Sequence, residues 1–180
     1  KIEGQEVSID APHHAMNYGI GMVHQEFMLI PGFTITENIK LNRENTKKTL
    51  LSKIFGKKLE KVDYNSMKKD ARIALDKLHM NIDEYLTVAG LPVGHMEFIE
   101  IAREIDKTQL KLLILDEPTA VLTESEASQF LDTVKRLANM GIAILFISHR
   151  LDEIKQITDR ITILRDGETI ESIETNKIDV

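Results

Sequence analysis

Two β-rich segments constrain the fold of this chain more than any other feature: residues 111–116, in which positions 112–115 are all apolar, and residues 142–147, which are apolar throughout. Neither alternates apolar with polar side chains, so both predict strands covered on both faces, as in a parallel sheet packed between helices. Between them, Thr123 and Glu126 form a capping box and Gly141 is a typical helix stop. The apolar positions recur every three or four residues: Ala127, Phe130, Leu131, Val134, Leu137 and Ala138. This strand–helix–strand unit predicts a right-handed βαβ crossover.

The regions on either side differ in character. Residues 32–106 are mainly helical in pattern, with one apolar stripe formed by Met67, Ala71, Ala74, Leu75 and Leu78. Within them, residues 42–61 are rich in lysine, which favours a solvated loop over the alternative of a contact with a membrane surface. Residues 161–165 and 168–173, joined by Asp166-Gly167, predict a β-hairpin with a type I′ turn. The predicted architecture is a parallel α/β core with a helical insertion.

Composition excludes several classes of protein. The chain has 180 residues and a net charge of −6, which argues against a coat for nucleic acid. It has no cysteine, so disulfides, thiolate zinc sites and cysteine nucleophiles are excluded. The longest apolar run, residues 142–147, is far shorter than the roughly 20 residues of a membrane-spanning helix. The chain begins with neither a signal peptide nor a methionine, and we expect it to continue a longer protein.

Two carboxylates, Asp116 and Glu117, stand at the end of the first apolar stretch. Ligands of open α/β sheets bind at the carboxyl ends of the strands. An aspartate there can hold Mg²⁺ beside the phosphates of a nucleotide, and the next carboxylate can orient or deprotonate an attacking water. The alternative is that Asp116 only starts a turn and Glu117 is a surface acid. The full run through Asp116-Glu117-Pro118-Thr119 disfavours that alternative.

This run resembles the Walker B motif of ATP-binding-cassette (ABC) ATPases, and three further segments resemble motifs of that family in the same order. Residues 20–26 are similar to the strand that leads into the Q-loop, with Gln25 as its glutamine. Residues 91–103 are similar to the signature segment and its helix, and residues 146–150 to the strand that ends in the switch histidine, here His149. The resemblance covers essentially the whole chain. It implies the α/β fold of P-loop NTPases, with a mainly parallel sheet and an inserted helical subdomain.

The resemblance also implies a division of the chain and a set of roles. Residues 1–32 would be a first part of the core, 33–105 the helical subdomain, and 106–180 the second part of the core. The cofactors implied are ATP and Mg²⁺. The implied site residues are Glu117, His149 and Gln25 for catalysis, Asp116 and Gln25 for Mg²⁺, and Leu91, Val93 and Gly94 for the ATP of a partner cassette.

Most ABC ATPases have aspartate at the position of Thr123. A threonine at this position, together with residues 24–26 and 100–102, resembles the sequences of the ATPases of bacterial monosaccharide importers. Such ATPases typically carry two cassettes on one polypeptide, and this chain resembles the first cassette more than the second. The resemblance implies transport-coupled ATP hydrolysis at the cytoplasmic face of the bacterial inner membrane. The implied partners are a second cassette, permease subunits and, indirectly, a solute-binding protein, but no nucleic acid.

Two departures from the family pattern stand out. No Gly-x-x-x-x-Gly-Lys-Ser/Thr loop is present, so we expect this chain alone neither to bind ATP usefully nor to hydrolyse it. Pro92 replaces the usual signature serine and His95 stands near the usual glutamine, which predicts a weak ATP site on the partner cassette. Two alternatives remain open: an ABC protein of the translation or repair type without membrane partners, and a degenerate regulatory cassette.

Overall fold

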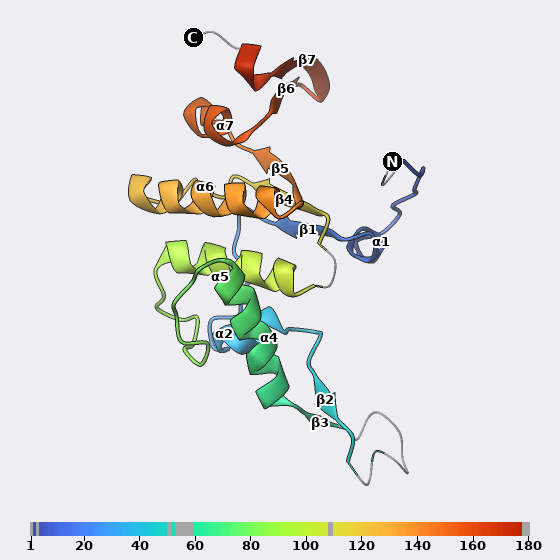
Figure 1. The fold of residues 1–180 in the computed structure, drawn as a ribbon, viewed down its shortest axis with the longest axis vertical. Coiled ribbons are helices and arrows are strands. Elements are labelled where there is room, and N and C mark those ends of the chain that lie inside the picture. The colour runs from blue at the N-terminus through green and yellow to red at the C-terminus, as the bar shows by residue number, and fades with distance from the viewer. Residues whose placement is uncertain (1, 3, 50–51, 53–59, 108–109, 178–180) are drawn as a thin grey trace.

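A parallel sheet forms the centre of the computed structural model (Figure 1). Its order is β1 (Ile20–Val23), β4 (Leu112–Asp116) and β5 (Ala143–Ile147). In register, Val23 lies opposite Leu115, and Asp116 lies opposite Ile147, so the strands end at one edge. The structure describes residues 2, 4–49, 52, 60–107 and 110–177.

The predicted βαβ unit is confirmed. Helix α6 (Glu124–Asn139) connects β4 to β5, and Thr123 and Glu126 form its capping box. The chain leaves the helix through Gly141, whose φ of 90° is a conformation that glycine adopts readily. The apolar face of α6 is buried as expected, except for Ala138, which is exposed at the last turn.

The expectation that residues 142–147 are covered on both faces is wrong. Ile144 and Phe146 pack against the core, but Leu145 is 50% exposed and Ile147 is 43% exposed. These side chains are exposed because β5 is an edge strand of the described sheet, and among the described helices α6 packs against one of its faces. The central strand β4 alternates between buried and half-buried residues instead.

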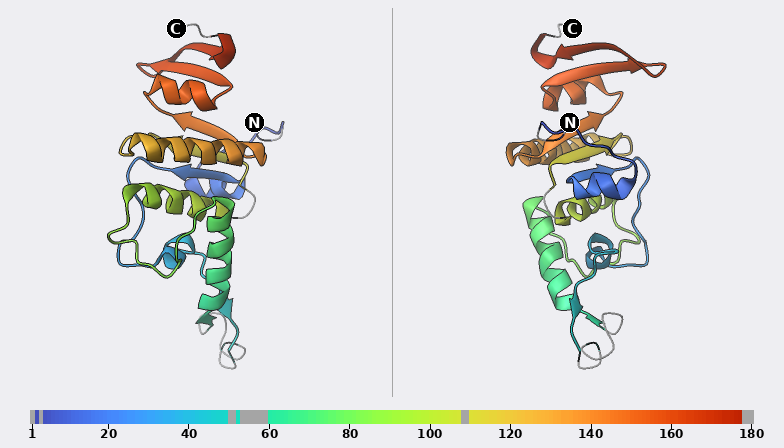
Figure 2. Two further views of the ribbon diagram at one scale, coloured as in Figure 1. Left: turned by 60° about the vertical axis from the view of Figure 1, so that its left-hand side comes forward. Right: turned by 90° about the vertical axis from the view of Figure 1, so that its right-hand side faces the viewer.

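Three helices pack together beside the sheet: α2 (Ile35–Ile39), α4 (Tyr64–Lys77) and α5 (Val93–Asp106). The predicted apolar stripe of residues 67–78 lies on α4 and its C-cap residue and is buried where this helix packs against α2 and α5, which confirms the helical character of this region. Helix α5 also contacts β1 and α6. In both views of Figure 2, α4 extends away from the sheet.

The lysine-rich region is not loop throughout. It contains a two-stranded antiparallel pair, β2 (Thr46–Lys47) and β3 (Lys61–Val62), because the two chain segments meet before α4 begins. Residues 50, 51 and 53–59 of this region lie outside the described residues.

The terminal parts of the described chain are a short helix and a hairpin. Helix α1 (Pro12–Asn17) precedes and contacts β1, and α7 (Leu151–Ile157) follows β5. Strands β6 (Arg160–Arg165) and β7 (Glu168–Glu174) then pair antiparallel, before a 3₁₀ turn at Thr175–Lys177.

The turn of this hairpin has the predicted type. Asp166 and Gly167 have φ values of 53° and 83°, and positive φ at both central positions defines a type I′ turn. The hairpin prediction is therefore confirmed. No helix in the described part of the chain combines the length and the apolar character needed to span a bilayer.

Candidate functional site

The backbone turns sharply where β4 ends. Glu117, the first residue after the strand, has a φ of 49°, in the left-handed region that residues other than glycine seldom adopt. Its N–H donates a hydrogen bond of 2.9 Å to the carbonyl oxygen of Ile147, the last residue of β5. Conformations of this kind cost about 1–3 kcal/mol and occur often at functional sites. The turn holds Glu117 against the end of the neighbouring strand.

The structure brings Glu117 and His149 into contact. Oε1 of Glu117 and Nδ1 of His149 are 2.9 Å apart. The histidine side chain is 76% exposed and the glutamate 20% exposed. Oε2 of Glu117 is buried and has no hydrogen-bond partner among the described residues. One carboxylate oxygen is therefore held by the imidazole, and the other is a buried acceptor without a donor among the described residues.

Gln25 and Asp116 lie at the same edge of the sheet. Asp116 is the half-buried last residue of β4, and its carboxylate has no ion-pair or hydrogen-bond partner in the described part of the chain. Gln25 is exposed and follows β1, the strand beside β4, by two residues. Neither side chain contacts the pair formed by Glu117 and His149 through a hydrogen bond between described residues.

These donors fit Mg²⁺ of the kind that accompanies a nucleotide. An unpartnered carboxylate and an amide oxygen are hard ligands, and Mg²⁺ usually keeps water and phosphate oxygens as its other ligands. Within the described residues, no group of three or more histidine, cysteine, aspartate or glutamate side chains could hold a metal. The arrangement suits an ion that arrives with a phosphate rather than one held by the protein alone.

A buried network fixes the two segments that carry Glu117 and His149. Thr119 is fully buried, and its hydroxyl donates to Oε2 of Glu153 at 2.5 Å. Nη1 of Arg150 donates to Oε1 of Glu153 at 2.6 Å and to the carbonyl oxygen of Thr119 at 3.3 Å. Arg150, Glu153 and Thr119 were not among the site residues predicted from the sequence. The i, i+3 spacing of Arg150 and Glu153 could have indicated an ion pair between them. No pattern in the sequence could have indicated the contact with Thr119.

The segment after Gln25 is tied to α5. The N–H of Met28 donates to Oε1 of Glu100 at 2.7 Å, and Nη1 of Arg103 donates to the carbonyl oxygen of Met28 at 3.1 Å. Arg103 also pairs with Glu100. Burial raises the pKa of Glu100, and the charge of Arg103 opposes that rise. Gln25 is thus only three residues from a point anchored to α5.

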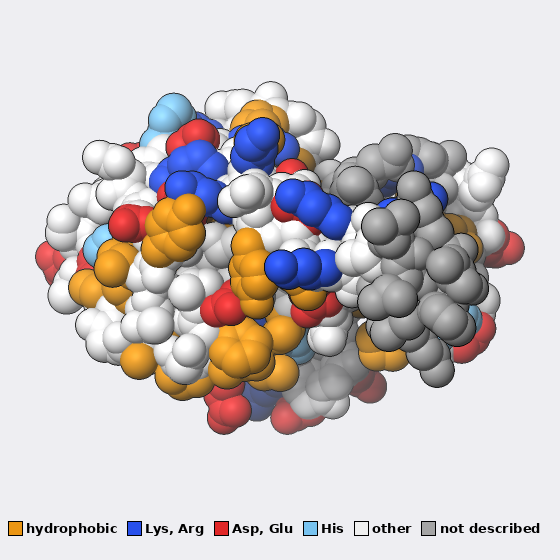
Figure 3. All heavy atoms as spheres, turned by 90° about the horizontal axis from the view of Figure 1, so that it is seen from below, with side chains coloured by type: hydrophobic (Ala, Val, Ile, Leu, Met, Phe, Trp, Pro, Cys, Tyr) orange, Lys and Arg blue, Asp and Glu red, His pale blue; other side chains and the backbone are white. Residues whose placement is uncertain are grey.

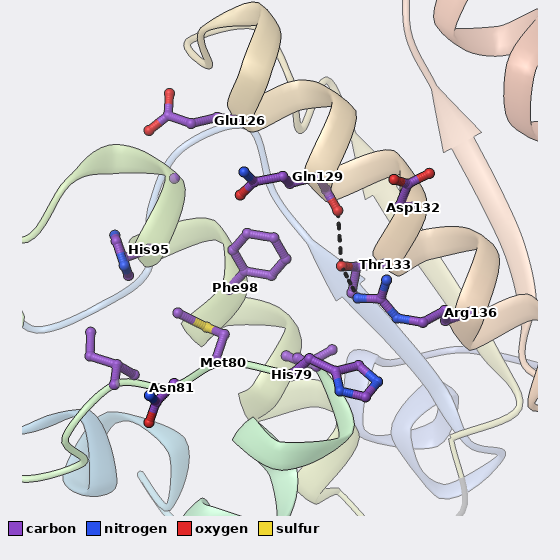
Figure 4. Close-up of a pocket in the computed structure, with 13 residues that line it drawn as sticks. His79, Met80, Asn81, His95, Phe98, Glu126, Gln129, Asp132, Thr133 and Arg136 are labelled. Atoms are coloured by element: carbon purple, nitrogen blue, oxygen red, sulfur yellow. Dashed lines mark hydrogen bonds between the residues drawn. The ribbon is translucent and has the colours of Figure 1, made fainter.

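Leu91 precedes α5, and Val93 and Gly94 are its first two residues; no hydrogen bond between described residues joins them to Glu117 or His149. The N-cap residue Pro92 makes no side-chain cap. A cavity of about 340 Å³ is lined by this end of α5, residues 78–82 and α6. In Figure 4, Phe98 of α5 faces Gln129 of α6 across the cavity.

The parallel α/β core and its attached group of helices match the fold of solved ATP-binding cassettes. A solved nucleotide-free ATP-binding cassette from an ABC transporter superposes with a TM-score of 0.77 at 24% identity, covering 96% of this chain and 67% of that one. A cassette structure described as the dimeric MJ0796 gives 0.69 at 20% identity, covering 93% and 68%. The α/β fold of P-loop NTPases is confirmed.

The pattern that defines the ABC transporter family matches residues 1–120, so the chain belongs to that family. The ribose import ATP-binding protein RbsA of Lactococcus lactis subsp. lactis is 38% identical, covering 98% of this chain and 35% of that protein. The nucleoside import ATP-binding protein NupA of Lactococcus lactis subsp. cremoris is 36% identical, covering 96% and 32%. The RbsA of Chelativorans sp. is 37% identical, covering 94% and 30%. The chain thus spans about a third of the length of these relatives.

Proposed function

We propose that this chain is part of the ATP-binding subunit of an import system for a sugar or a related small solute, and that ATP hydrolysis drives the transport. The contact between Glu117 and His149, where β4 and β5 end, carries the proposal. It unites the two groups that family membership assigns to the reacting phosphate. The similar proteins, which include ribose and nucleoside import ATP-binding proteins, support import as the process.

Glu117 and His149 divide the chemistry between them. The carboxylate of Glu117 accepts a proton from the water that attacks the γ-phosphate. His149 donates to a γ-phosphate oxygen and stabilises the charge that develops there. Its contact with Oε1 of Glu117 keeps both side chains at the same edge of the sheet.

Gln25 and Asp116 serve the metal that accompanies ATP. Asp116 and the amide oxygen of Gln25 are the groups that would hold Mg²⁺. When bound, Mg²⁺ neutralises charge on the phosphates. The anchoring of Met28 to α5 gives Gln25 a mechanical link to the helical region, through which the state of the phosphate can reach the transport partner.

The signature residues act on a second cassette. Leu91, Val93 and Gly94 face the ATP held by the partner cassette, and the first N–H groups of α5 supply its anion site. Pro92 provides neither a hydroxyl nor an N–H at the position where a serine is usual. We therefore propose that the ATP site which this signature completes is weak or silent.

Permease subunits are the membrane partner that the surface supports. Met28, Ile30 and Phe33, which follow the Q-loop glutamine, are exposed, and so are Tyr85 and Leu86. The two segments are neighbours, because the N–H of Ile35 donates to the carbonyl oxygen of Leu86 and the N–H of Val88 donates to the carbonyl oxygen of Phe33.

Figure 3 shows one end of the molecule, with hydrophobic and basic side chains at the surface. A surface of mixed apolar and charged groups suits reversible docking onto another protein. The subunit would sit peripherally at the cytoplasmic face of the bacterial inner membrane, with a solute-binding protein as an indirect partner.

Residues 1–180 by themselves are not expected to hold ATP. The sequence contains no Gly-x-x-x-x-Gly-Lys-Ser/Thr loop, which supplies the backbone N–H groups and the lysine that bind the β- and γ-phosphates. Isothermal titration with ATP and Mg²⁺ should show no saturable heat for this chain. The same titration should show binding for a polypeptide that joins a phosphate loop to its N-terminal side.

Glu117→Gln tests the proposed function in such an extended polypeptide. Loss of a general base should lower ATP turnover by about a hundredfold or more while ATP affinity stays within a few fold. Glu168→Gln, on the exposed hairpin, is the matched control and should leave both values unchanged. Unchanged turnover in Glu117→Gln would remove this residue from the reaction and would contradict the proposal.

A further inference from the structure

The carboxylate of Glu126 serves two helices at once. Its Oε2 accepts hydrogen bonds from the N–H and the hydroxyl of Thr123, at 3.0 Å and 2.8 Å, and so closes the capping box of α6. Its Oε1 reaches the other way: a β-carbon placed on Gly94 would lie only 2.8 Å from this atom. A glycine at this position permits the close approach. The carboxylate therefore lies against the first turn of α5.

Helix α5 has no anion of its own at this end. Its first turn contains no acidic residue, and Pro92 supplies no side-chain cap. The N–H groups of His95 and Met96 donate to the carbonyl oxygen of Pro92. The first N–H groups, those of Val93 and Gly94, have no carbonyl partner within the helix, and the helix dipole is positive here. Negative charge is favoured at this position, and Glu126 is the acidic group that lies there.

Charge and hydrogen bonding keep Glu126 ionised. The N–H of Thr123, followed by its hydroxyl, lowers the pKa of Glu126, and the charge of His95 and the N–H of Gly94 act in the same direction. The other charged groups along the cavity between α5 and α6 are His79, Asp132 and Arg136. In Figure 4 they lie beyond Gln129 and Phe98, at the far end from Glu126.

We propose that the carboxylate of Glu126 occupies the N-terminal anion position of α5 and competes there with a phosphate presented to residues 91–94. The inference rests on the proposed function, because that phosphate is the γ-phosphate of the nucleotide held by the partner cassette. Its arrival displaces Glu126 from α5 but leaves the capping box of α6 intact. The cavity of about 340 Å³ between the helices gives α5 room to shift once that contact is lost.

The first test follows the amide of Gly94 by NMR in the 180-residue chain. Between pH 3 and 5.5, where carboxylates titrate, its shift should follow the ionisation of Glu126. Glu126→Gln keeps an acceptor for the capping box but removes the charge, so the response should disappear. Glu37→Gln is the matched control, since Glu37 holds the same place in the capping box of α2. An unchanged Gly94 response in Glu126→Gln would overturn the proposal.

The second test titrates inorganic phosphate into the same three proteins at pH 7. A carboxylate at a helix N-terminus has an effect of about 0.3–1 kcal/mol, which corresponds to roughly two- to fivefold in affinity. Glu126→Gln should therefore bind phosphate about two- to fivefold more tightly, with shifts centred on Val93 and Gly94. Equal affinities in all three proteins, or no response at these amides, would contradict the competition.

Neither test depends on ATP turnover. If Glu117→Gln leaves turnover unchanged but the Gly94 amide follows Glu126, the proposed function fails and the occupied anion position stands. If turnover falls as expected but Glu126→Gln changes neither the Gly94 titration nor phosphate affinity, the proposed function stands and the occupied anion position fails.

Discussion

The carboxyl group of Glu97 should make the stability of this chain depend strongly on pH. Glu97 is only 2% exposed, its Oε2 has no hydrogen-bond partner among the described residues, and Glu100 lies one turn further along α5. Burial, followed by the negative charge of Glu100, raises the pKa of Glu97 from 4.5 to about 8. The folded state therefore holds this proton more tightly than the unfolded state does.

The sign and size of the effect follow from linkage. Because the folded pKa is the higher one, the stabilisation is fully present below pH 4.5 and is lost as the pH rises to about 8. At 1.36 kcal/mol per pKa unit, the free energy of unfolding should fall by about 3 kcal/mol between pH 5 and pH 8 through this group. Glu100 acts in the same direction, since burial also raises its pKa.

Glu97→Gln isolates this contribution. Urea unfolding followed by circular dichroism at several values between pH 5 and pH 8 gives the free energy of unfolding of each protein. The variant should gain stability relative to the wild type as the pH rises, by about 3 kcal/mol over this range. Glu171→Gln, on exposed β7, is the control and should run parallel to the wild type. Parallel profiles for Glu97→Gln and the wild type would refute the reasoning.

Three further substitutions test the contacts around the site. Gly94→Ala should stabilise the Glu126→Ala variant by roughly 0.5–1 kcal/mol, because alanine favours a helix more than glycine does. In the wild type the same change should give no gain in stability, because the new β-carbon meets Glu126. Equal gains in both proteins would argue against the contact. Glu153→Ala should lower the free energy of unfolding by about 2–3 kcal/mol, because it strands the buried Thr119 hydroxyl, and a change below about 0.5 kcal/mol would contradict this. Pro92→Ser in the assembled transporter should raise ATP turnover by roughly ten- to a hundredfold, and no gain would show that the proline is not limiting.

The strands, the crossover helix and the hairpin were predictable because their signals are local. Residues 112–116 form the central strand β4, Thr123 and Glu126 cap a helix, and Asp166-Gly167 makes the turn of the hairpin. Each signal depends on neighbours within a few residues, so the sequence alone contains it. The open face of β5 was not predictable in this way. It depends on which elements cover the strand, and an apolar run carries no information about that.

The candidate site was predicted through motifs, and the structure adds the contacts that motifs do not specify. Glu117 and His149 were expected at one edge and prove to be in contact, while the division of the chain into core and helical parts stays a prediction. The anchoring of Met28 by Glu100 and Arg103 joins residues far apart in the sequence, as does the approach of Glu126 to Gly94. Such pairs have no periodicity that could have indicated them.

The central claim is that Gln25, Asp116, Glu117 and His149 surround one metal-bound triphosphate. Paramagnetic broadening by Mn²⁺-ATP, measured by NMR in a polypeptide that joins a phosphate loop to these residues, tests it most directly. The account predicts strong broadening of the amides at these four positions and none at Gly167, in the turn of the distant hairpin. Broadening that spares two or more of the four, or that centres elsewhere, would contradict it.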